Sequence, residues 1–352
     1  MGKTSSEPLS VEMHLMRGDN MASCAVAEAV RDAHLQGEGD VYAVNAECAD
    51  GTYADYYFDG NEEIKLLYKC PGPTDCDTFA RSYRHVADHV LNTTKCKDMK
   101  DARLDCIVLA RMLASAVVSG GSVADWNPYN INGEYFPRIA SGFDCRDTMY
   151  GFDKLENIGL YLIVPDDTWF ERAVRCGVKT IQLRAKEAPI GEVDRMVRRC
   201  AQLSKDKGVC LIVNDHWNIA IEHGAHGVHL GQEDVQTADL ESILKSKMKL
   251  GLSTHCYHEL ARACFIRPSY VALGPVFHTT SKDMRFKPQG LQLLKQWVQC
   301  AKLPVVGIGG IDASNIGSVV NCGVSGVAVI SAVTRAEDPE AAMLNLQRAF
   351  DV

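Results

Sequence analysis

Polar residues that could bind a metal ion follow two apolar stretches of the chain. Asn214 and Asp215 come directly after "VCLIV", and Gln232, Glu233 and Asp234 come after "HGVHL". Carboxylate oxygens are hard ligands, and two carboxylates together with substrate phosphates suit Mg²⁺, which rarely occupies an all-protein cage. These residues indicate a site for a metal-bound phosphate group at Asp215 and Asp234, although an isolated Asn-Asp pair is more often a turn or a helix cap.

Basic residues and glycines near other apolar stretches fit a phosphorylated substrate. Arg184 and Lys186 follow one stretch, and Lys282 and Arg285 follow another. A few focused cations can form a basic cleft on an acidic protein. The glycines of "GIGGI" (307–311) let backbone N–H groups approach a phosphate, and the next helix N-terminus adds its dipole. Each motif alone could be an ordinary loop or structural polarity inside a barrel, but compatible chemistry at nearly every strand end favours one site.

The elements that must position these residues repeat along the second half of the chain. Short apolar runs alternate with amphipathic stretches, and continuous apolar runs are typical of strands buried on both faces. Eight runs predict a (β/α)8 TIM barrel rather than a doubly wound open sheet, with the site at the C-terminal ends of the strands. The runs are 158–164, 179–184, 209–213, 226–230, 249–253, 270–274, 304–308 and 326–330.

The first half of the chain has a different pattern. Residues 41–70 contain two Asp-Gly turn signals between β-rich runs, which is typical of hairpins. Residues 77–92 and 101–121 show the apolar spacing of amphipathic helices. The predicted fold class is therefore α/β: a smaller α+β accessory domain over residues 1–150, a linker around 122–157, and a TIM-barrel domain over 155–352.

Composition narrows the function classes. The net charge of −8 argues against broad nucleic-acid binding, which needs a basic face. The 14 cysteines include no Cys-x-x-Cys pair, so we expect reduced thiols rather than a zinc site. No membrane-spanning or secretory segment is expected, which favours a cytoplasmic protein. The first residues match the Met-Gly-x-x-x-Ser pattern for N-myristoylation at Gly2.

The motifs of the second half, taken in order, closely resemble those of the thiamine-phosphate synthase family. The resemblance extends over about residues 158–350, with family-like spacing between the motifs. They are "QLRAK" (182–186), "ND" (214–215), "GQED" (231–234), "STH" (253–255), "GPVFHTTSK" (274–282), "GIGGI" (307–311) and "ISA" (330–332).

This resemblance implies a Mg²⁺-dependent transferase of thiamine biosynthesis. Members of the family join 4-amino-2-methyl-5-hydroxymethylpyrimidine diphosphate to 4-methyl-5-hydroxyethylthiazole phosphate and release thiamine phosphate and diphosphate. Diphosphate departs and the thiazole nitrogen attacks, so the protein mainly neutralises the leaving group and aims the nitrogen. The implied partners are these small phosphorylated molecules, without nucleic acid or a membrane span, and a homo-oligomer is left open.

The same resemblance assigns individual roles. Mg²⁺ is assigned to Asp215 and Asp234. Catalytic roles are assigned to Arg184, Lys186, Ser253 and Lys282. The pyrimidine diphosphate is assigned to Gln182, Arg184, Lys186, Asn214, Ser253 and Lys282. The thiazole phosphate is assigned to Thr279, Ser281, Gly310, Ile330 and Ser331, where Ser281 replaces the more usual Thr and keeps its hydroxyl.

Residues 41–120 loosely resemble the C-terminal part of hydroxymethylpyrimidine phosphate kinase, behind which this synthase is fused in some organisms. That kinase needs a Gly-Thr-Gly-Cys anion hole, and the corresponding place here reads "GPTDCDTF" (72–79). The glycines are lost, and the added aspartate would repel phosphate. We therefore predict that the first domain is non-catalytic, either a remnant of such a kinase or an unrelated accessory domain for packing, oligomerisation or regulation.

Two other functions are compatible with such a barrel. A regulator that binds the product could dispense with Asp215, Asp234, Arg184 and Lys282, yet the chain retains all four. A related thiazole tautomerase needs no diphosphate site, so both aspartates and the run 182–186 argue against it. The synthase remains the interpretation that uses all of the polar strand ends.

Overall fold

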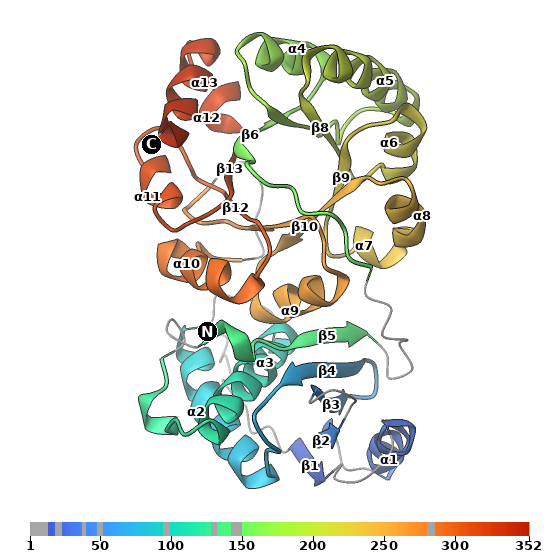
Figure 1. The fold of residues 1–352 in the computed structure, drawn as a ribbon, viewed down its shortest axis with the longest axis vertical. Coiled ribbons are helices and arrows are strands. Elements are labelled where there is room, and N and C mark those ends of the chain that lie inside the picture. Colours follow the sequence, from blue (N-terminus) through green and yellow to red (C-terminus); the bar gives the residue numbers. More distant parts are fainter. Residues whose placement is uncertain are drawn as a thin grey trace, which may run out of the picture. The chain divides into compact units, whose positions relative to one another are not determined.

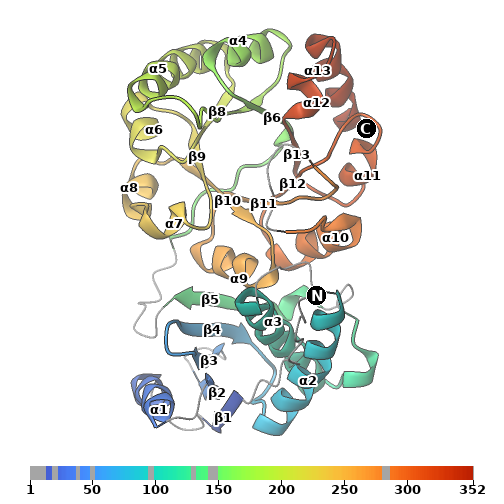
Figure 2. The ribbon, with the colours of Figure 1, turned by 180° about the vertical axis from the view of Figure 1, so that it is seen from behind.

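The computed structural model describes residues 13–17, 23–36, 40–47, 52–93, 99–127, 132–141, 150–279 and 286–351. The chain divides into two compact units, residues 1–148 and 149–352 (Figures 1 and 2). Each unit has its own sheet and its own buried core. Within these described ranges, no helix is both long enough and apolar enough to cross a membrane.

A five-stranded mixed sheet forms the first unit. Its strands lie side by side in chain order, with a parallel β1–β2 pair and antiparallel pairs thereafter. The β2–β3 and β3–β4 pairs are the expected hairpins, and Gly60 adopts φ +89° in the second turn. The strands are β1 (Met13–Arg17), β2 (Asp40–Glu47), β3 (Thr52–Phe58), β4 (Glu63–Lys69) and β5 (Arg138–Ser141). The helices are α1 (Ser23–Leu35), α2 (Cys76–Thr93) and α3 (Met99–Val118), with 3-10 turns at Val123–Asp125 and Gly133–Tyr135.

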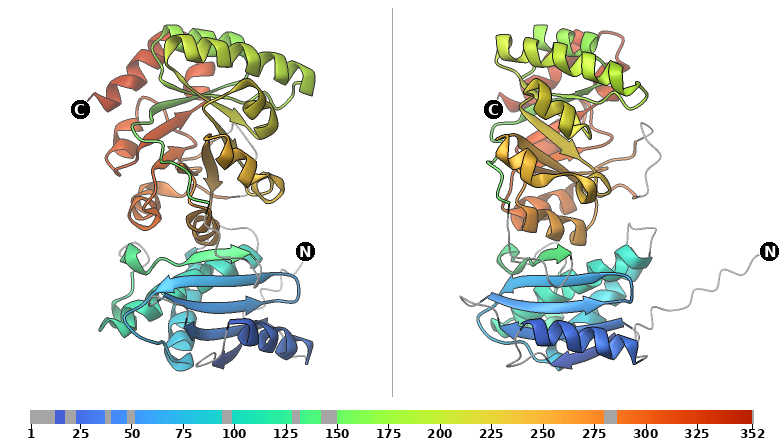
Figure 3. Two further views of the ribbon diagram at one scale, coloured as in Figure 1. Left: turned by 45° about the vertical axis from the view of Figure 1, so that its right-hand side comes forward. Right: turned by 90° about the vertical axis from the view of Figure 1, so that its right-hand side faces the viewer.

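Helices pack against both faces of this sheet, because side chains alternate along its strands. On one face, Tyr42 of β2 stacks on Phe79 of α2, with ring centroids 4.4 Å apart. On the other face, Phe58 of β3 meets His34 of α1 edge to face at 4.8 Å. Figure 3 shows the sheet of this unit from two directions. The predicted α+β architecture of the first half is confirmed.

A fully buried ion pair joins the sheet of this unit to α3. The Nε atom of Arg111 lies 3.0 Å from Oδ2 of Asp55, and both side chains are completely buried. The hydroxyls of Tyr42 and Tyr68 donate to Asp55 at 2.5 and 2.9 Å, and Arg111 Nη1 donates to Thr74 Oγ1 at 3.1 Å. Burial and the neighbouring carboxylate raise the pKa of both tyrosines, which keeps their protons in place as donors. The buried negative charge of Asp55 is therefore balanced by Arg111 and by the two tyrosine hydroxyls.

Part of the segment predicted as a linker is structured instead. Residues 138–141 form β5, which pairs antiparallel with β4. Further along, the backbone N–H groups of Phe152 and Leu155 donate to the carbonyl oxygens of Arg267 and Ser269 at 2.9 and 3.0 Å. These bonds tie residues 150–157 to the second unit, where Leu155 packs against the barrel core.

The second unit is a closed eight-stranded parallel barrel surrounded by helices, as predicted. Strand order follows the chain, and β13 pairs with β6 to close the ring, which excludes the open doubly wound sheet. The strands are β6 (Gly159–Val164), β7 (Thr180–Leu183), β8 (Cys210–Asn214), β9 (Gly227–Leu230), β10 (Lys249–Thr254), β11 (Tyr270–Leu273), β12 (Val305–Ile308) and β13 (Gly326–Val329). The helices are α4 (Asp167–Arg175), α5 (Ile190–Lys207), α6 (Trp217–His223), α7 (Asp234–Thr237), α8 (Leu240–Lys245), α9 (Tyr257–Ile266), α10 (Gly290–Ala301), α11 (Ile316–Val320), α12 (Ser331–Thr334) and α13 (Pro339–Gln347), with a 3-10 turn at Arg348–Phe350.

The period of two along each strand decides which residues enter the barrel. The inner core is a cluster of alternate residues from the strands and the segment before β6: Ile158, Tyr161, Ile163, Ile212, Tyr270, Ala272, Val306 and Ala328. Residues between them face the helices, and Thr254 accepts a hydrogen bond from Trp297 of α10 at 3.1 Å. The same alternation brings the polar residues at the strand ends to one mouth of the barrel.

Candidate active site

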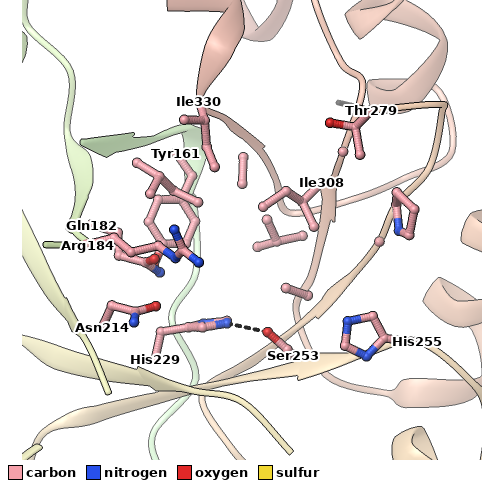
Figure 4. Close-up of a pocket in the computed structure, with 17 residues that line it drawn as sticks. Tyr161, Gln182, Arg184, Asn214, His229, Ser253, His255, Thr279, Ile308 and Ile330 are labelled. Atoms are coloured by element: carbon pink, nitrogen blue, oxygen red, sulfur yellow. Dashed lines mark hydrogen bonds between the residues drawn. The ribbon is translucent and has the colours of Figure 1, made fainter. Parts of the chain in front are cut away.

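A pocket opens at the C-terminal ends of the barrel strands, and every strand contributes to its lining (Figure 4). The polar part of the lining comes mainly from β7 to β10 and the residues that follow them. The apolar part comes mainly from β6 and β11 to β13. The lining residues are Tyr161, Ile163, Gln182, Arg184, Asn214, His229, Ser253, His255, Ala272, Gly274, Pro275, Thr279, Val306, Ile308, Gly309, Ala328 and Ile330.

The structure brings many of the predicted site residues together. Six of them line the pocket directly: Gln182, Arg184, Asn214, Ser253, Thr279 and Ile330. Gly310 and Ser331 are the chain neighbours of the lining residues Gly309 and Ile330. Ser281 and Lys282, like Arg285, lie outside the described residues, so their predicted roles stay predictions.

Asp215 and Asp234, the predicted metal ligands, are electrostatic neighbours. Burial first, and then the negative charge of Asp234, raises the pKa of Asp215 above its usual range, while Lys186 opposes this rise. The Nζ atom of Lys186 is 3.9 Å from Oδ2 of Asp215. Asp215 has φ +62°, and its backbone N–H donates to the carbonyl oxygen of His229 at 3.0 Å. The fold therefore holds Asp215 in a left-handed conformation, which costs free energy for a residue other than glycine and is found most often at functional sites.

The two glycines of "GIGGI" serve a close backbone approach. Gly309 and Gly310 have φ +98° and +66°. A Cβ at Gly309 would lie 2.6 Å from Pro275, and one at Gly310 would lie 2.9 Å from Phe277. The loop after β11 is tied to this turn by bonds from Val276 N–H to the Ile308 carbonyl (2.8 Å) and from Phe277 N–H to the Gly309 carbonyl (3.0 Å). The following helix, α11, begins only at Ile316, whereas α12 begins at Ser331 directly after the last strand.

The sequence interpretation missed polar residues that stand inside the barrel below the mouth. Tyr161 and His229 both line the pocket, and neither had been assigned a role. His229 lies between Val228 and Leu230, so its inward direction follows from the period of two. A polar residue alternating with apolar ones inside a parallel strand was the signal that could have identified it.

These interior residues form a continuous chain of hydrogen bonds. Gln182 Nε2 donates to the Tyr161 hydroxyl at 2.8 Å, and the hydroxyls of Tyr161 and Tyr270 are 2.7 Å apart. The Tyr270 hydroxyl is 2.9 Å from Nδ1 of His229, whose Nε2 is 2.9 Å from Oγ of Ser253. Figure 4 shows this last bond at the floor of the pocket. The pocket thus has an ordered polar floor beneath its apolar wall.

Comparison with known proteins identifies the family. The family model for thiamine monophosphate synthase matches residues 160–333. The thiamine-phosphate synthase of Neisseria gonorrhoeae is 46% identical over 192 residues, which make up 54% of this chain and 94% of that protein. The thiamine-phosphate synthase of Serratia proteamaculans is 45% identical over 195 residues, or 55% of this chain and 92% of that protein.

The chain belongs to the thiamine-phosphate synthase family. A solved structure, the thiamine phosphate pyrophosphorylase of Pyrococcus furiosus, is 31% identical with a TM-score of 0.51 and covers 56% of this chain and 96% of that chain. These matches confirm the resemblance drawn from the motifs and the expected transferase class. They fall in the barrel unit, so the kinase likeness of the first unit stays a prediction.

Charged and neutral polar residues occupy different positions around the pocket. Arg184 lines the pocket just after the end of β7, whereas Tyr161 also lines it and packs with Tyr270 in the barrel core. The mouth therefore contains the charged groups, and the interior contains neutral hydroxyl, amide and imidazole groups.

Proposed function

We propose that this chain catalyses the Mg²⁺-dependent condensation of 4-amino-2-methyl-5-hydroxymethylpyrimidine diphosphate with 4-methyl-5-hydroxyethylthiazole phosphate. The products are thiamine phosphate and diphosphate. The observation that carries this proposal is that Gln182, Arg184, Asn214 and Ser253 line one pocket, with Asp215 directly after Asn214 in the chain and Asp234 as its electrostatic neighbour. The membership of the family supports the same reaction.

The reaction requires charge neutralisation more than covalent catalysis. The bond between the pyrimidine methylene carbon and the diphosphate oxygen breaks, and the oxygen keeps the electron pair. The lone pair of the thiazole nitrogen then forms the new bond to that carbon. Arg184 at the pocket and Lys186 near its mouth are placed to compensate the charge of the leaving diphosphate, which is the main electrostatic demand of this step.

The carboxylates fit a divalent cation. Burial and the negative charge of Asp234 raise the pKa of Asp215, and Lys186 is a partial counter-charge. A divalent cation prefers such oxygen ligands and would add the missing positive charge. When bound, Mg²⁺ would supply further stabilisation to the diphosphate. The residues that we assign to it are Asp215 and Asp234.

The apolar wall fits the heterocyclic rings. Ile163, Val306, Ile308 and Ile330 line the side of the pocket opposite the polar strand ends. Apolar surface excludes water from the carbon at which the new bond forms, and water would otherwise compete with the thiazole nitrogen. Holding both rings in one water-poor pocket also removes most of the entropic cost of bringing two substrates together.

The direct test supplies both substrates and Mg²⁺ to the full chain and measures thiamine phosphate. We expect product from the wild type and almost none from Asp215→Asn or Asp234→Asn. The matched control is Asp239→Asn, since Asp239 caps α8 outside the pocket and asparagine is an equally good cap. Near-wild-type rates in both pocket variants would overturn the metal assignment. Product binding without turnover by the wild type would instead favour the regulator.

A further inference from the structure

The polar floor of the pocket is a built feature of the barrel. Gln182, Tyr161, Tyr270 and His229 are all at least nine-tenths buried, and they come from four different strands. Their hydrogen bonds connect end to end and finish at Ser253, which lines the pocket. Buried polar groups that are fully paired in this way fix one another's orientation.

The chain of hydrogen bonds can run in either of two directions beyond Tyr161. The amide Nε2 of Gln182 is a donor only, so the hydroxyl oxygen of Tyr161 accepts from it. In the direction that leaves the Ser253 proton free for a substrate, Tyr161 donates to Tyr270, and Tyr270 donates to Nδ1 of His229. An imidazole that accepts at Nδ1 has its proton on Nε2, and Nε2 faces Oγ of Ser253. The Ser253 hydroxyl is then an acceptor from His229.

This direction requires a neutral imidazole. His229 is buried, and its two ring nitrogens lie within hydrogen-bond distance of neutral hydroxyls, those of Tyr270 and Ser253. A neutral imidazole, with one donor and one acceptor nitrogen, satisfies both contacts. Its effect on the reaction has to act through the group it contacts.

The backbone beside the network leaves room for it. Gly251 lies on β10, two residues before Ser253, and faces the same way into the barrel. A Cβ at Gly251 would lie 2.6 Å from Nδ1 of His229 and would also overlap the Tyr270 ring. Only glycine at this position permits the contact between Tyr270 and His229, so the strand that presents Ser253 is also shaped for its supporting residues.

We propose that His229 is a positioning residue whose Nε2–H tautomer, set by Tyr270, turns the hydroxyl of Ser253 into a hydrogen-bond donor aimed at an acceptor of the pyrimidine diphosphate. Among the described residues, His229 is the only side chain within hydrogen-bond distance of Ser253 Oγ. The Ser253 proton is accordingly left for the pocket. This inference rests on the proposed function for its substrate, whereas the tautomer itself does not depend on turnover.

The first experiment reads the tautomer directly. In the full chain labelled with ¹⁵N-histidine, the His229 signals are assigned by their loss in His229→Gln. We expect the chemical shifts of an Nε2–H imidazole in the wild type and a mixture of tautomers in Tyr270→Phe, which removes one hydroxyl and keeps the ring. A wild-type imidazole protonated on Nδ1 would overturn the proposal, whether or not the protein turns over.

The second experiment is a double-mutant cycle on the condensation reaction. We expect Tyr270→Phe to lower kcat/KM by about 10- to 100-fold, a typical range for groups that orient a functional residue through hydrogen bonds. In a Ser253→Ala background the same change should have almost no further effect, because its target is gone. Equal factors in both backgrounds would mean that Tyr270 acts on general stability, and the proposal would fall.

The matched control is Tyr257→Phe, which changes a buried tyrosine of α9 that packs on Trp297 outside the pocket. It should leave kcat/KM near the wild-type value. If the wild type forms no thiamine phosphate, the proposed function fails while the tautomer measurement still tests the inference. If the wild type is active and the cycle is additive, the inference alone fails.

Discussion

The buried His229 should make the free energy of unfolding of the barrel unit depend on pH. The side chain is buried, and burial with the charges of Arg184 and His255 lowers its pKa to about 4. In the unfolded chain the same group titrates near about 6.5. Between these values the unfolded state binds a proton that the folded state does not. The free energy of unfolding must therefore fall as the pH decreases from 6.5 to 4 and be insensitive to this group above that range.

The magnitude follows from the two pKa values. A separation of about 2.5 pKa units corresponds to a total of about 3 kcal/mol, of which about 2 kcal/mol is lost between pH 7 and pH 5. That loss is a sizeable part of the usual stability of a domain, about 5–15 kcal/mol. Replacing His229 with glutamine removes the titrating group. The free energy of unfolding of this variant should therefore fall by about 2 kcal/mol less than that of the wild type between pH 7 and pH 5. The lost hydrogen bonds lower the stability of the variant by the same amount at every pH and do not affect this difference.

Urea unfolding at several pH values measures the effect. Tryptophan fluorescence reports mainly on the barrel unit, because three of the four tryptophans, Trp169, Trp217 and Trp297, lie in it. The control is His278→Gln, which removes an exposed imidazole. The comparison uses slopes rather than absolute values, so carboxylate titrations common to all variants cancel. Parallel curves for wild type and His229→Gln would refute a buried, neutral His229.

Three further outcomes are expected from other parts of the chain. The acid limb of the pH–rate profile should move to lower pH as the Mg²⁺ concentration is increased, because the raised pKa of Asp215 lets protons compete with the cation. An acid limb that does not change with Mg²⁺ concentration would show that Asp215 does not bind the metal. Arg111→Met should cost the first unit about 3–5 kcal/mol in urea unfolding by leaving Asp55 buried without its partner, and adding Asp55→Leu should recover part of that loss. Unchanged stability of Arg111→Met would contradict this account of the core. A chain trimmed to residues 150–352 should keep most of the condensation activity, since a relative of comparable extent is covered over 94% of its length; loss of activity in a folded fragment would give the first unit a role in the site.

The barrel could be predicted because its strands impose a simple demand on the sequence. Strands buried on both faces need continuous apolar runs, and each run ends where the chain reaches solvent. The run predicted at 209–213 is the strand β8 (Cys210–Asn214), and the run at 158–164 contains β6 (Gly159–Val164). Because parallel strands all end at one mouth, the polar residues after them could be assigned to one site before any coordinates were considered.

The missed features depend on contacts between distant parts of the chain. Tyr161 and Tyr270 are 109 positions apart, and only closure of the barrel brings their hydroxyls to 2.7 Å. The strand β5 has four residues and no distinctive pattern, and it exists because it pairs with β4, more than sixty positions earlier in the chain. Local composition can indicate an inward direction for His229, but it cannot supply the tyrosine that sets its tautomer.

The circular order of the strands separates the two proposed substrates. Most residues assigned to the pyrimidine diphosphate come from the arc of β7 to β10: Gln182 lies on β7, Asn214 ends β8, and Ser253 lies on β10, whereas Lys282 follows β11 in the sequence. Residues assigned to the thiazole phosphate follow β11 and β13, namely Thr279 and Ile330. If both assignments hold, the phosphates occupy opposite arcs of one rim, where their charges repel least, and the two rings must meet near the barrel axis. The interior beneath that meeting point contains Tyr161, Ala272 and Ala328, which carry no charge. Under the proposed function, the new carbon–nitrogen bond would therefore form where no protein nucleophile competes for the carbon and apolar surface limits access of water.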